Sequence, residues 1–394
     1  MSFSPDDARA RFPGLSTPWA LLDNAGGAQM LDAAIDRVRD AFLTSNVQPG
    51  GTYPASALAA ERTDAATRAW ARCLNAADPR EIVFGASTTQ LLQNLSRAIE
   101  PSIRPGDEIV VCEADHESNI GPWVRLEARG ASIRWWRVNP ETFELSLDEL
   151  AKLLTPRTRL LAFAQVSNVL GHVNPAREAV RLARGVGAKV VVDGVAFAPH
   201  RKVDVRALDA DYYVASLYKV YGPRVSLLYG KLDLLQALTP VNHFFLPADK
   251  LPHKLAPGGL SFELVHGAGA VPEYLASLDE KAVAAHEAAL AERVLSFLRG
   301  RVKIIGRPKG DVDRLPTISF AIPGRDAAEL PPRLEVHGVG VKAGDFYARR
   351  LCDALGLTAR GGVVRASFVH YNTLEEADRL IAALDEAITR TEGR

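Results

Sequence analysis

The sequence predicts an α/β fold in which a large, doubly wound and mostly parallel sheet domain precedes a smaller α+β domain. Strand-like stretches alternate with helical stretches through residues 81–230, the pattern of parallel βαβ units. A β-branched run over Lys189–Val192 ends on Asp193, and a second run over Tyr212–Ser216 stops just before Lys219. An acid and a lysine therefore follow buried strands, at the edge where open α/β sheets bind their ligands.

Composition narrows the class of protein. The chain has 394 residues, enough for two or three domains with a large core. Its 47 basic and 47 acidic residues cancel, which argues against a nucleic-acid partner. The start of the chain lacks the apolar core of a secretory signal, and no apolar run approaches the roughly 20 residues of a membrane helix. Cys73, Cys112 and Cys352 lack metal-ligand spacing, so we expect free thiols, no metal site and a cytoplasmic location.

The first segment leads to a glycine pair. A short strand-like run over Ala20–Leu22 is followed by Asp23, Asn24, Ala25, Gly26 and Gly27. Paired glycines allow another group to approach the backbone closely, and they also fit a plain turn before a helix. Both interpretations stay open for this segment.

Periodicity places the other elements of the large domain. The expected helices span Leu31–Thr44, Ala55–Asn75, Gln90–Ile99, Ser146–Leu154 and Pro175–Gly187, and the expected strands span Glu81–Phe84, Asp107–Cys112, Ser132–Val138, Leu160–Gln165 and Val225–Tyr229. Between strand Glu81–Phe84 and the next helix lie Ser87, Thr88 and Thr89. Hydroxyl groups before a helix form an anion site or an ordinary helix cap.

The pairing of Asp193 with Lys219 suits pyridoxal phosphate. This cofactor needs a lysine amine to form a Schiff base and a carboxylate to keep its pyridine nitrogen protonated, so that the ring withdraws electrons. A capping aspartate and a surface lysine are the alternative. No G-x-G-x-x-G follows any strand, which disfavours a dinucleotide cofactor.

The segments VVVDG and SLYKVYGP resemble the class V aminotransferase group of fold-type I pyridoxal phosphate enzymes, and most closely the cysteine desulfurase and selenocysteine lyase branch. The similarity extends along nearly the whole chain. It implies a covalent cofactor on Lys219, a pyridine contact from Asp193 and a homodimer with the active site near the subunit interface.

The resemblance also assigns roles to single residues. In the cofactor set, Thr88 and Thr89 correspond to the family's G-T-T-E phosphate loop, and Asn168 corresponds to the asparagine of V-S-N-V-L-G. His116 corresponds to the ring-stacking histidine of E-H-x-A-N-x-x-P-W, which can also pass protons. Ser216 corresponds to the strand end before the lysine, and Gly259 to a threonine that reaches the partner's phosphate. Gly259 equally fits a glycine turn without function. The substrate set comprises Asn24 in LDNAGG, Arg365 in R-A-S as the carboxylate-binding residue, and His243 as a candidate at the mouth.

The expected small domain contains helices over Phe262–Leu278, Lys281–Leu298, Ala327–His337 and Leu374–Thr391 and strands over Val302–Ile305, Thr317–Ala321, Val339–Lys342 and Val363–Phe368. We expect residues 1–22 to pack on this domain, residues 23–262 to form the large cofactor-binding domain and residues 263–394 to form the small one.

The sequence departs from the family at the residue that receives sulfur. Tyr347 stands where V-x-V-R-T-G-x-x-C-A has its cysteine, and a phenol cannot hold a persulfide as a thiolate does. Cys352, five residues later, is the alternative nucleophile. Ala196 and Tyr218 also replace the family's glutamine and histidine near the cofactor.

These departures predict a lyase acting on an amino acid. The expected reaction is C–S cleavage of cysteine or a cysteine conjugate by β-elimination, with Lys219 as base and Tyr347 available to protonate the leaving sulfur. The alternatives are an aminotransferase, an epimerase, a desulfurase that uses Cys352, and a cofactor-binding regulator or sulfur-carrier partner without turnover.

Overall fold

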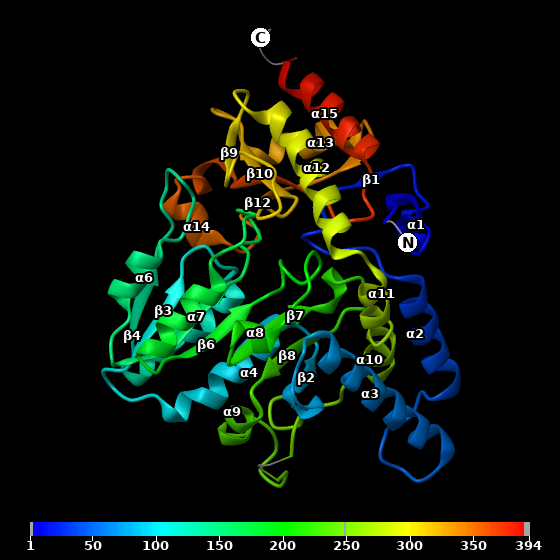
Figure 1. The fold of residues 1–394 in the computed structure, drawn as a ribbon, viewed down its shortest axis with the longest axis vertical. Coiled ribbons are helices and arrows are strands. Elements are labelled where there is room, and N and C mark those ends of the chain that lie inside the picture. The colour runs from blue at the N-terminus through cyan, green and yellow to red at the C-terminus, as the bar shows by residue number, and fades with distance from the viewer. Residues whose placement is uncertain (1–2, 248–249, 390–394) are drawn as a thin grey trace.

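The computed structural model describes residues 3–247 and 250–389 and confirms the predicted α/β fold (Figure 1). The large domain contains a seven-stranded sheet in the order β2-β8-β7-β6-β5-β3-β4. Strand β8 runs antiparallel to both of its neighbours, and the other neighbouring pairs are parallel. The strands are β2 (Ile82–Gly85), β3 (Glu108–Cys112), β4 (Ser132–Trp136), β5 (Thr158–Ala164), β6 (Lys189–Asp193), β7 (Tyr212–Ser216) and β8 (Ser226–Gly230).

Helices cover both faces of this sheet. One face packs against side chains from α3 (Pro54–Cys73), α6 (Leu147–Leu153), α7 (Ala176–Gly185), α8 (Val205–Leu208), α10 (Phe262–Ala268) and α11 (Val271–Ser277). The other face packs against α4 (Thr88–Ile99), α5 (Gly121–Val124) and α9 (Leu232–Ala237). Helix α2 (Asp32–Thr44) packs on α10.

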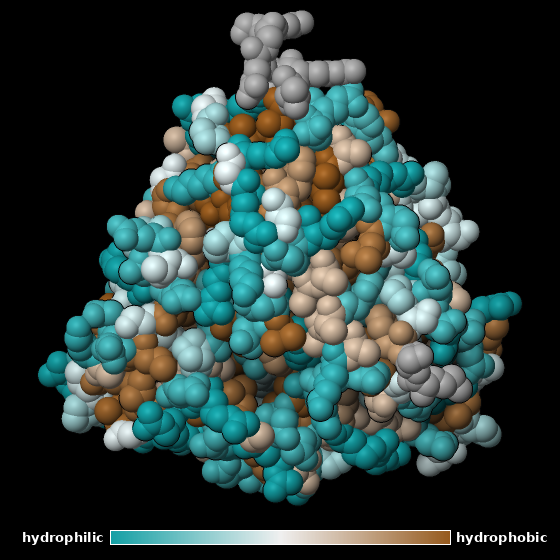
Figure 2. Space-filling model, turned by 45° about the horizontal axis from the view of Figure 1, so that its top comes forward, coloured by the Kyte–Doolittle hydropathy of each residue, from teal (hydrophilic) through white to brown (hydrophobic). Residues whose placement is uncertain are grey.

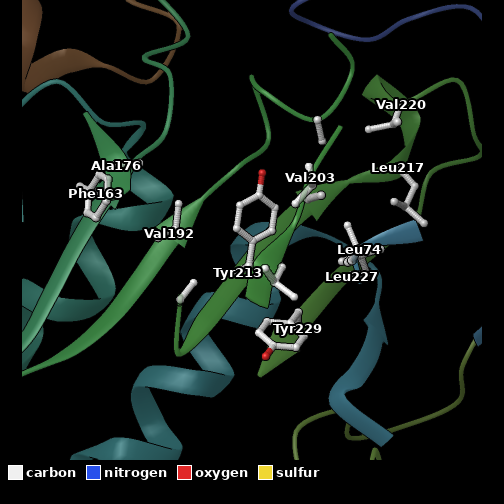
Figure 3. Close-up of a cluster of buried hydrophobic side chains, with 14 of the residues drawn as sticks. Leu74, Phe163, Ala176, Val192, Val203, Tyr213, Leu217, Val220, Leu227 and Tyr229 are labelled. Atoms are coloured by element: carbon white, nitrogen blue, oxygen red, sulfur yellow. The ribbon is translucent and has the colours of Figure 1, made fainter. Parts of the chain in front are cut away.

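Because both faces are covered, the central strands β6 and β7 are apolar at their internal positions. In β6, Val190 and Val192 belong to one core cluster and Val191 to the other. In β7, Tyr213 and Tyr212 alternate between the two clusters in the same way. Figure 3 shows part of the first cluster, with Val192 and Tyr213 on neighbouring strands. Polar side chains can therefore leave the core only where the strands end.

The small domain is built on a four-stranded antiparallel sheet in the order β12-β13-β10-β9. Its strands are β9 (Lys303–Ile305), β10 (Thr317–Ala321), β12 (Lys342–Gly344) and β13 (Val363–Ser367), and its helices are α12 (Glu280–Leu298), α13 (Pro331–Glu335), α14 (Arg349–Ala354) and α15 (Leu374–Thr389). The expected helix over Leu374–Thr391 thus agrees up to Thr389, and its last two positions lie outside the described residues.

Three predicted elements are divided in the structure. The expected strand Val339–Lys342 divides into β11 (Val339–Gly340) and β12, because β11 pairs with the N-terminal strand β1 (Ala20–Leu21). The expected helix Phe262–Leu278 breaks between α10 and α11, where Gly269 lies against Ala66 of α3 and Pro272 lies in the first turn of the next helix. The expected helix Ala327–His337 divides into a 3-10 turn over Ala327–Glu329 and α13, which begins with two prolines.

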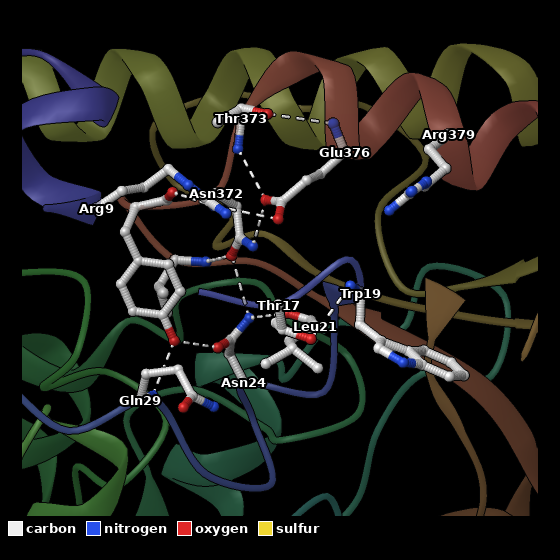
Figure 4. Close-up of polar contacts among 12 residues, drawn as sticks. Arg9, Thr17, Trp19, Leu21, Asn24, Gln29, Asn372, Thr373, Glu376 and Arg379 are labelled. Carbon is white, nitrogen blue, oxygen red and sulfur yellow. Dashed lines mark hydrogen bonds and ion pairs between the residues drawn. The ribbon is translucent and has the colours of Figure 1, made fainter. Parts of the chain in front are cut away.

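The N-terminal segment, which begins with α1 (Pro5–Arg9), is bound to the small domain around Asn24 (Figure 4). The Asn24 side-chain amide donates to the carbonyl oxygens of Leu21 and Ser367 and to Asn372 Oδ1, at 2.8 to 3.1 Å. Its oxygen accepts a 2.5 Å hydrogen bond from the Tyr371 hydroxyl. Every polar atom of the Asn24 side chain is therefore used to join the N-terminal segment to the small domain.

No helix among the described residues is long and apolar enough to cross a membrane. On the face shown in Figure 2, hydrophobic residues lie in small groups separated by hydrophilic ones.

We predict that Asn24→Ala lowers the free energy of unfolding by about 2 kcal/mol, because it leaves buried polar groups with fewer partners. Urea denaturation measures the change. Asn46, an exposed residue after α2, is the control, and Asn46→Ala should change the value by less than about 0.5 kcal/mol. Equal effects of the two substitutions would contradict the role given to Asn24.

Candidate active site

A cavity of about 720 Å³ opens at the carboxyl ends of the parallel strands, beside the small domain. Most of the residues that the sequence singled out line it, namely Thr88, Thr89, His116, Asn168, Asp193, Ser216, Lys219 and Tyr347. They come from the segments after β2, β3, β5, β6 and β7 and from the turn before α14. The topology of the sheet therefore brings together groups that are up to 259 positions apart, from Thr88 to Tyr347.

One end of the cavity is suited to a phosphate. Thr88 and Thr89 form the first turn of the 12-residue helix α4, whose free N–H groups face this end of the sheet. The Thr88 hydroxyl lies 2.7 Å from the Ser216 hydroxyl at the end of β7. Hydroxyl donors and a helix N-terminus together favour a phosphate monoester.

Asp193 is buried at the end of β6. Its Oδ1 accepts a 2.8 Å hydrogen bond from the backbone N–H of Val195. Burial raises the pKa of Asp193 to about 6, against the opposite effects of the Val195 N–H and of the Lys219 charge. A protonated pyridine nitrogen would provide the positive partner that this buried carboxylate needs.

Lys219 lies in the turn after β7, on the same cavity. Burial lowers the pKa of Lys219 to about 8, and the charge of Arg365 lowers it further, whereas Asp193 and Asp23 raise it. A substantial fraction of the amine is therefore neutral, and thus nucleophilic, near pH 8. The phosphate end, the buried acid and this amine are the donor set of pyridoxal phosphate, so the residues present fit that cofactor.

His116 is held in one protonation state and tautomer. Burial lowers the pKa of His116 to about 4, with further lowering by Lys219 and Arg365, so the ring is neutral at pH 7. The backbone N–H of Ser118 donates to Nδ1 at 3.1 Å, and the Ser118 hydroxyl lies 2.8 Å from the same nitrogen. The single ring proton is thus on Nε2. Ser118 was not predicted as a site residue, because a serine two residues after a histidine is not distinctive.

Tyr347 belongs to a turn between β12 and α14 that packs on the large domain. Its side chain is 71% exposed, and its ring centroid lies 5.0 Å from that of His116. The backbone N–H of Glu117 donates to the Tyr347 carbonyl oxygen at 2.8 Å, and Arg350 forms an ion pair with Glu117. The phenol is therefore positioned next to the histidine at the accessible side of the cavity.

Arg365 lies beside the cavity without lining it. Nη2 donates to Asp23 Oδ1 at 2.9 Å, and Nη1 donates to the Asn168 carbonyl oxygen at 3.1 Å. The ring of Phe346 covers the guanidinium, with 3.7 Å between Cζ and the ring centroid. Neither Asp23 nor Phe346 was predicted as a site residue, although Asp23 directly precedes Asn24.

The loop that carries Asn168 is held by the small domain. The carbonyl oxygens of residues 168, 169 and 170 accept hydrogen bonds from Arg365, Ser319 and Arg314 at 3.1, 2.7 and 2.6 Å. These three donors come from, or directly precede, the strands of the small sheet. The loop therefore follows β5 in the chain but is fixed in place by the other domain.

Three predicted site residues lie elsewhere. Asn24 does not line the cavity and its amide is used in the contacts with the small domain, so its role in substrate binding stays a prediction. His243 is exposed and stacks on Phe245 with 5.4 Å between ring centroids, also away from the cavity of this chain. Gly259 is exposed, and a role across a subunit interface stays a prediction that one chain does not test.

None of the three cysteines, all of which lie in described parts of the chain, lines the cavity. Cys352 is fully buried in α14, and burial raises its pKa to about 11. Cys112 is buried inside β3, and Cys73 is half-buried at the end of α3. The alternative in which Cys352 acts as a thiolate nucleophile is therefore disfavoured.

A buried acid behind Asp193 was also missed by the sequence analysis. Asp115 accepts hydrogen bonds from the Ala164 N–H and from Asn119 Nδ2 at 2.9 and 2.7 Å. Burial raises the pKa of Asp115 to about 8, and the charge of Asp193 raises it further. Its place directly before His116 was the available signal.

Comparison with known proteins agrees with this geometry. The family model described as aminotransferase class-V matches residues 20–380. The aminotransferase-like protein FGM3 of Gibberella zeae is 38% identical, with 98% of each chain covered. A cysteine desulfurase of Dickeya dadantii is 35% identical, with 96% of this chain and 95% of the relative covered. Among solved structures, the cysteine desulfurase CsdA of Escherichia coli is 30% identical over 99% of each chain, with a TM-score of 0.88.

We predict that loading of the cofactor-free protein with pyridoxal phosphate depends on the neutral amine of Lys219. Below pH 8 the rate should fall about tenfold per pH unit, and above pH 8 it should level off, because the lowered pKa of about 8 sets the neutral fraction. The visible absorbance of the bound cofactor measures loading. Lys219→Ala is the control and should give no covalent attachment. A midpoint near the ordinary lysine pKa of about 10.4 would contradict the assignment.

Proposed function

The chain belongs to the aminotransferase class-V family and uses pyridoxal phosphate, and we propose that it cleaves the C–S bond of cysteine or an S-substituted cysteine by β-elimination. One observation carries the proposal: the cavity brings Lys219, Asp193, His116 and Tyr347 together, and the three cysteines lie outside its lining. The similarity to cysteine desulfurases supports a sulfur-containing amino acid as the substrate class.

In this proposal the bound cofactor supplies the electron sink that makes the substrate α-proton acidic. Lys219 removes that proton, because its lowered pKa of about 8 favours the neutral amine that a base requires. Asp193 holds the positive charge at the pyridine end. Arg365 binds the substrate carboxylate and fixes which Cα bond lies closest to Lys219.

We assign Tyr347 the role of proton donor to the departing sulfur. Its phenol lies beside His116 at the accessible side of the cavity, where a β-substituent would extend towards solvent. Loss of the α-proton to Lys219 and of RS⁻ from the β-carbon leaves the three-carbon enamine. Tyr347 donates a proton to RS⁻ and recovers it from water. One water molecule is consumed overall, and pyruvate, ammonium and the thiol RSH are released.

An aminotransferase is the second candidate, and its supporting observation is the 38% identity to an aminotransferase-like protein. The same residues would then exchange amino and keto groups, while an epimerase would only return the α-proton. A desulfurase that uses Cys352 is disfavoured by the burial of that thiol. A regulator without turnover is disfavoured because Lys219, Asp193 and His116 share one cavity.

We propose product analysis of the holoprotein with L-cysteine, cystine and S-methylcysteine as the test. Pyruvate and ammonium in equal amounts are expected. A keto acid without ammonium would indicate an aminotransferase, and alanine with protein-bound sulfur would indicate a desulfurase. Either result, or unchanged substrate with the cofactor attached, would overturn the C–S lyase proposal.

Tyr347→Phe tests the proton donor. We predict that kcat for C–S cleavage falls at least about tenfold while cofactor loading is unchanged, because only the hydroxyl is removed. The loss should be smallest for substrates whose leaving thiol has the lowest pKa. A kcat equal to that of the unchanged protein would show that Tyr347 only fills the position.

The assembly, domain limits and location are also proposals. Phe244 and Phe245 are 100% and 68% exposed in the segment before Gly259, and the exposure of two neighbouring aromatic rings supports a homodimer in which a second copy covers them. Light scattering distinguishes a homodimer from a monomer.

We retain the domain limits 1–22, 23–262 and 263–394. Three free cysteines support a cytoplasmic location.

A further inference from the structure

Arg365 is close to the reacting groups and yet covered. Its side chain is only 3% exposed, and it does not line the cavity that contains Lys219 and His116. The guanidinium Cζ lies 3.7 Å from the ring centroid of Phe346, a distance at which the ring stacks directly on the cation. Phe346 therefore covers the group that would bind a carboxylate.

The guanidinium also has an unused donor. Nη1 and Nη2 contact the Asn168 carbonyl oxygen and Asp23, whereas the buried Nε makes no hydrogen bond within the described residues. Asp23 has a second cation within 3.2 Å, Lys342, which is 69% exposed. Because Lys342 can hold Asp23, the guanidinium can accept a second carboxylate on its Nε side without leaving Asp23 unpaired.

The turn that carries Phe346 is strained and fixed at both sides. Phe346 and Tyr347 have φ values of 52° and 60°, which are unfavourable for residues with a side chain. Asn168 Nδ2 donates to the Phe346 carbonyl oxygen, and the Glu117 N–H donates to that of Tyr347, both at 2.8 Å. Two hydrogen bonds to the large domain thus hold a strained backbone in place.

We propose that Phe346 determines access to Arg365, covering the guanidinium in the free protein and moving aside when the carboxylate of a bound amino acid reaches the Nε side. The proposal rests on the assignment of Arg365 to the substrate carboxylate in the proposed function. It is independent of which bond is cleaved. A ligand without a carboxylate forms no ion pair with Arg365, so the Phe346 ring stays on the guanidinium.

The test measures the accessibility of Arg365 directly. The holoprotein and its Phe346→Ala variant are treated with phenylglyoxal, which modifies accessible guanidinium groups, and labelling of Arg365 is followed by peptide mass spectrometry. We expect labelling about tenfold faster in the variant, equivalent to about 1.4 kcal/mol, which is within the range for a buried ring–cation stack. Propionate should protect Arg365 in both proteins, at about tenfold lower concentration in the variant.

Two further variants make the test decisive. Phe346→Leu keeps most of the side-chain volume and should accelerate labelling less than Phe346→Ala, so a folding defect of the alanine variant does not prevent the test. Phe297 stacks on Arg301 at 4.4 Å in the small domain and gives a matched control, since Phe297→Ala should leave Arg365 labelling unchanged. Equal labelling in all proteins would overturn the proposal, as would a higher propionate requirement in the Phe346 variants.

Failure of the proposed function is distinguishable from failure of this inference. Labelling and protection do not require turnover, so they report on Phe346 even if the products are those of an aminotransferase. If propionate protects Arg365 in no protein, then Arg365 is not the carboxylate site and both the gate and the substrate assignment are wrong.

Discussion

Burial of the central sheet on both faces is the constraint on which the site depends. Since β6 and β7 are apolar at every internal position, an acid or an amine can be placed only where a strand ends. Asp193 and Lys219 occupy such ends and remain close enough to the core to be poorly hydrated. The fold thereby creates an acid that holds its proton more tightly and a lysine that releases its proton more easily.

The small domain contributes the other positive group of the site, Arg365, and its charge is balanced differently from that of Lys219. Arg365 is paired with Asp23 and covered by an aromatic ring, whereas Lys219 has no acidic partner in contact within the described part of the chain. The two positive groups therefore differ in availability. The amine faces the open cavity, and the guanidinium becomes available only after a rearrangement of its neighbours.

The sequence predicted the sheet and the residues at its edge because strand periodicity and strand ends are local signals. Asp193, Lys219, His116 and Tyr347 line one cavity in the structure, and their chemical roles stay predictions. The sequence did not show which groups bind the Asn24 amide, because those partners lie more than 340 positions later. The cover on Arg365 was equally hidden, since no local pattern reports that a ring 19 positions earlier in the chain lies on a guanidinium.

The hydrogen bonds that hold residues 168–170 have a consequence for how such a site can diversify. The loop is anchored by Arg314, Ser319 and Arg365, none of which lines the cavity, and Arg314 and Ser319 have no part in the proposed reaction. Substitutions at these two anchors would shift Asn168 and retune substrate preference from a distance while the reacting groups stayed intact. Substrate specificity within this fold would then diverge through substitutions in the small domain, while the cofactor chemistry stayed unchanged.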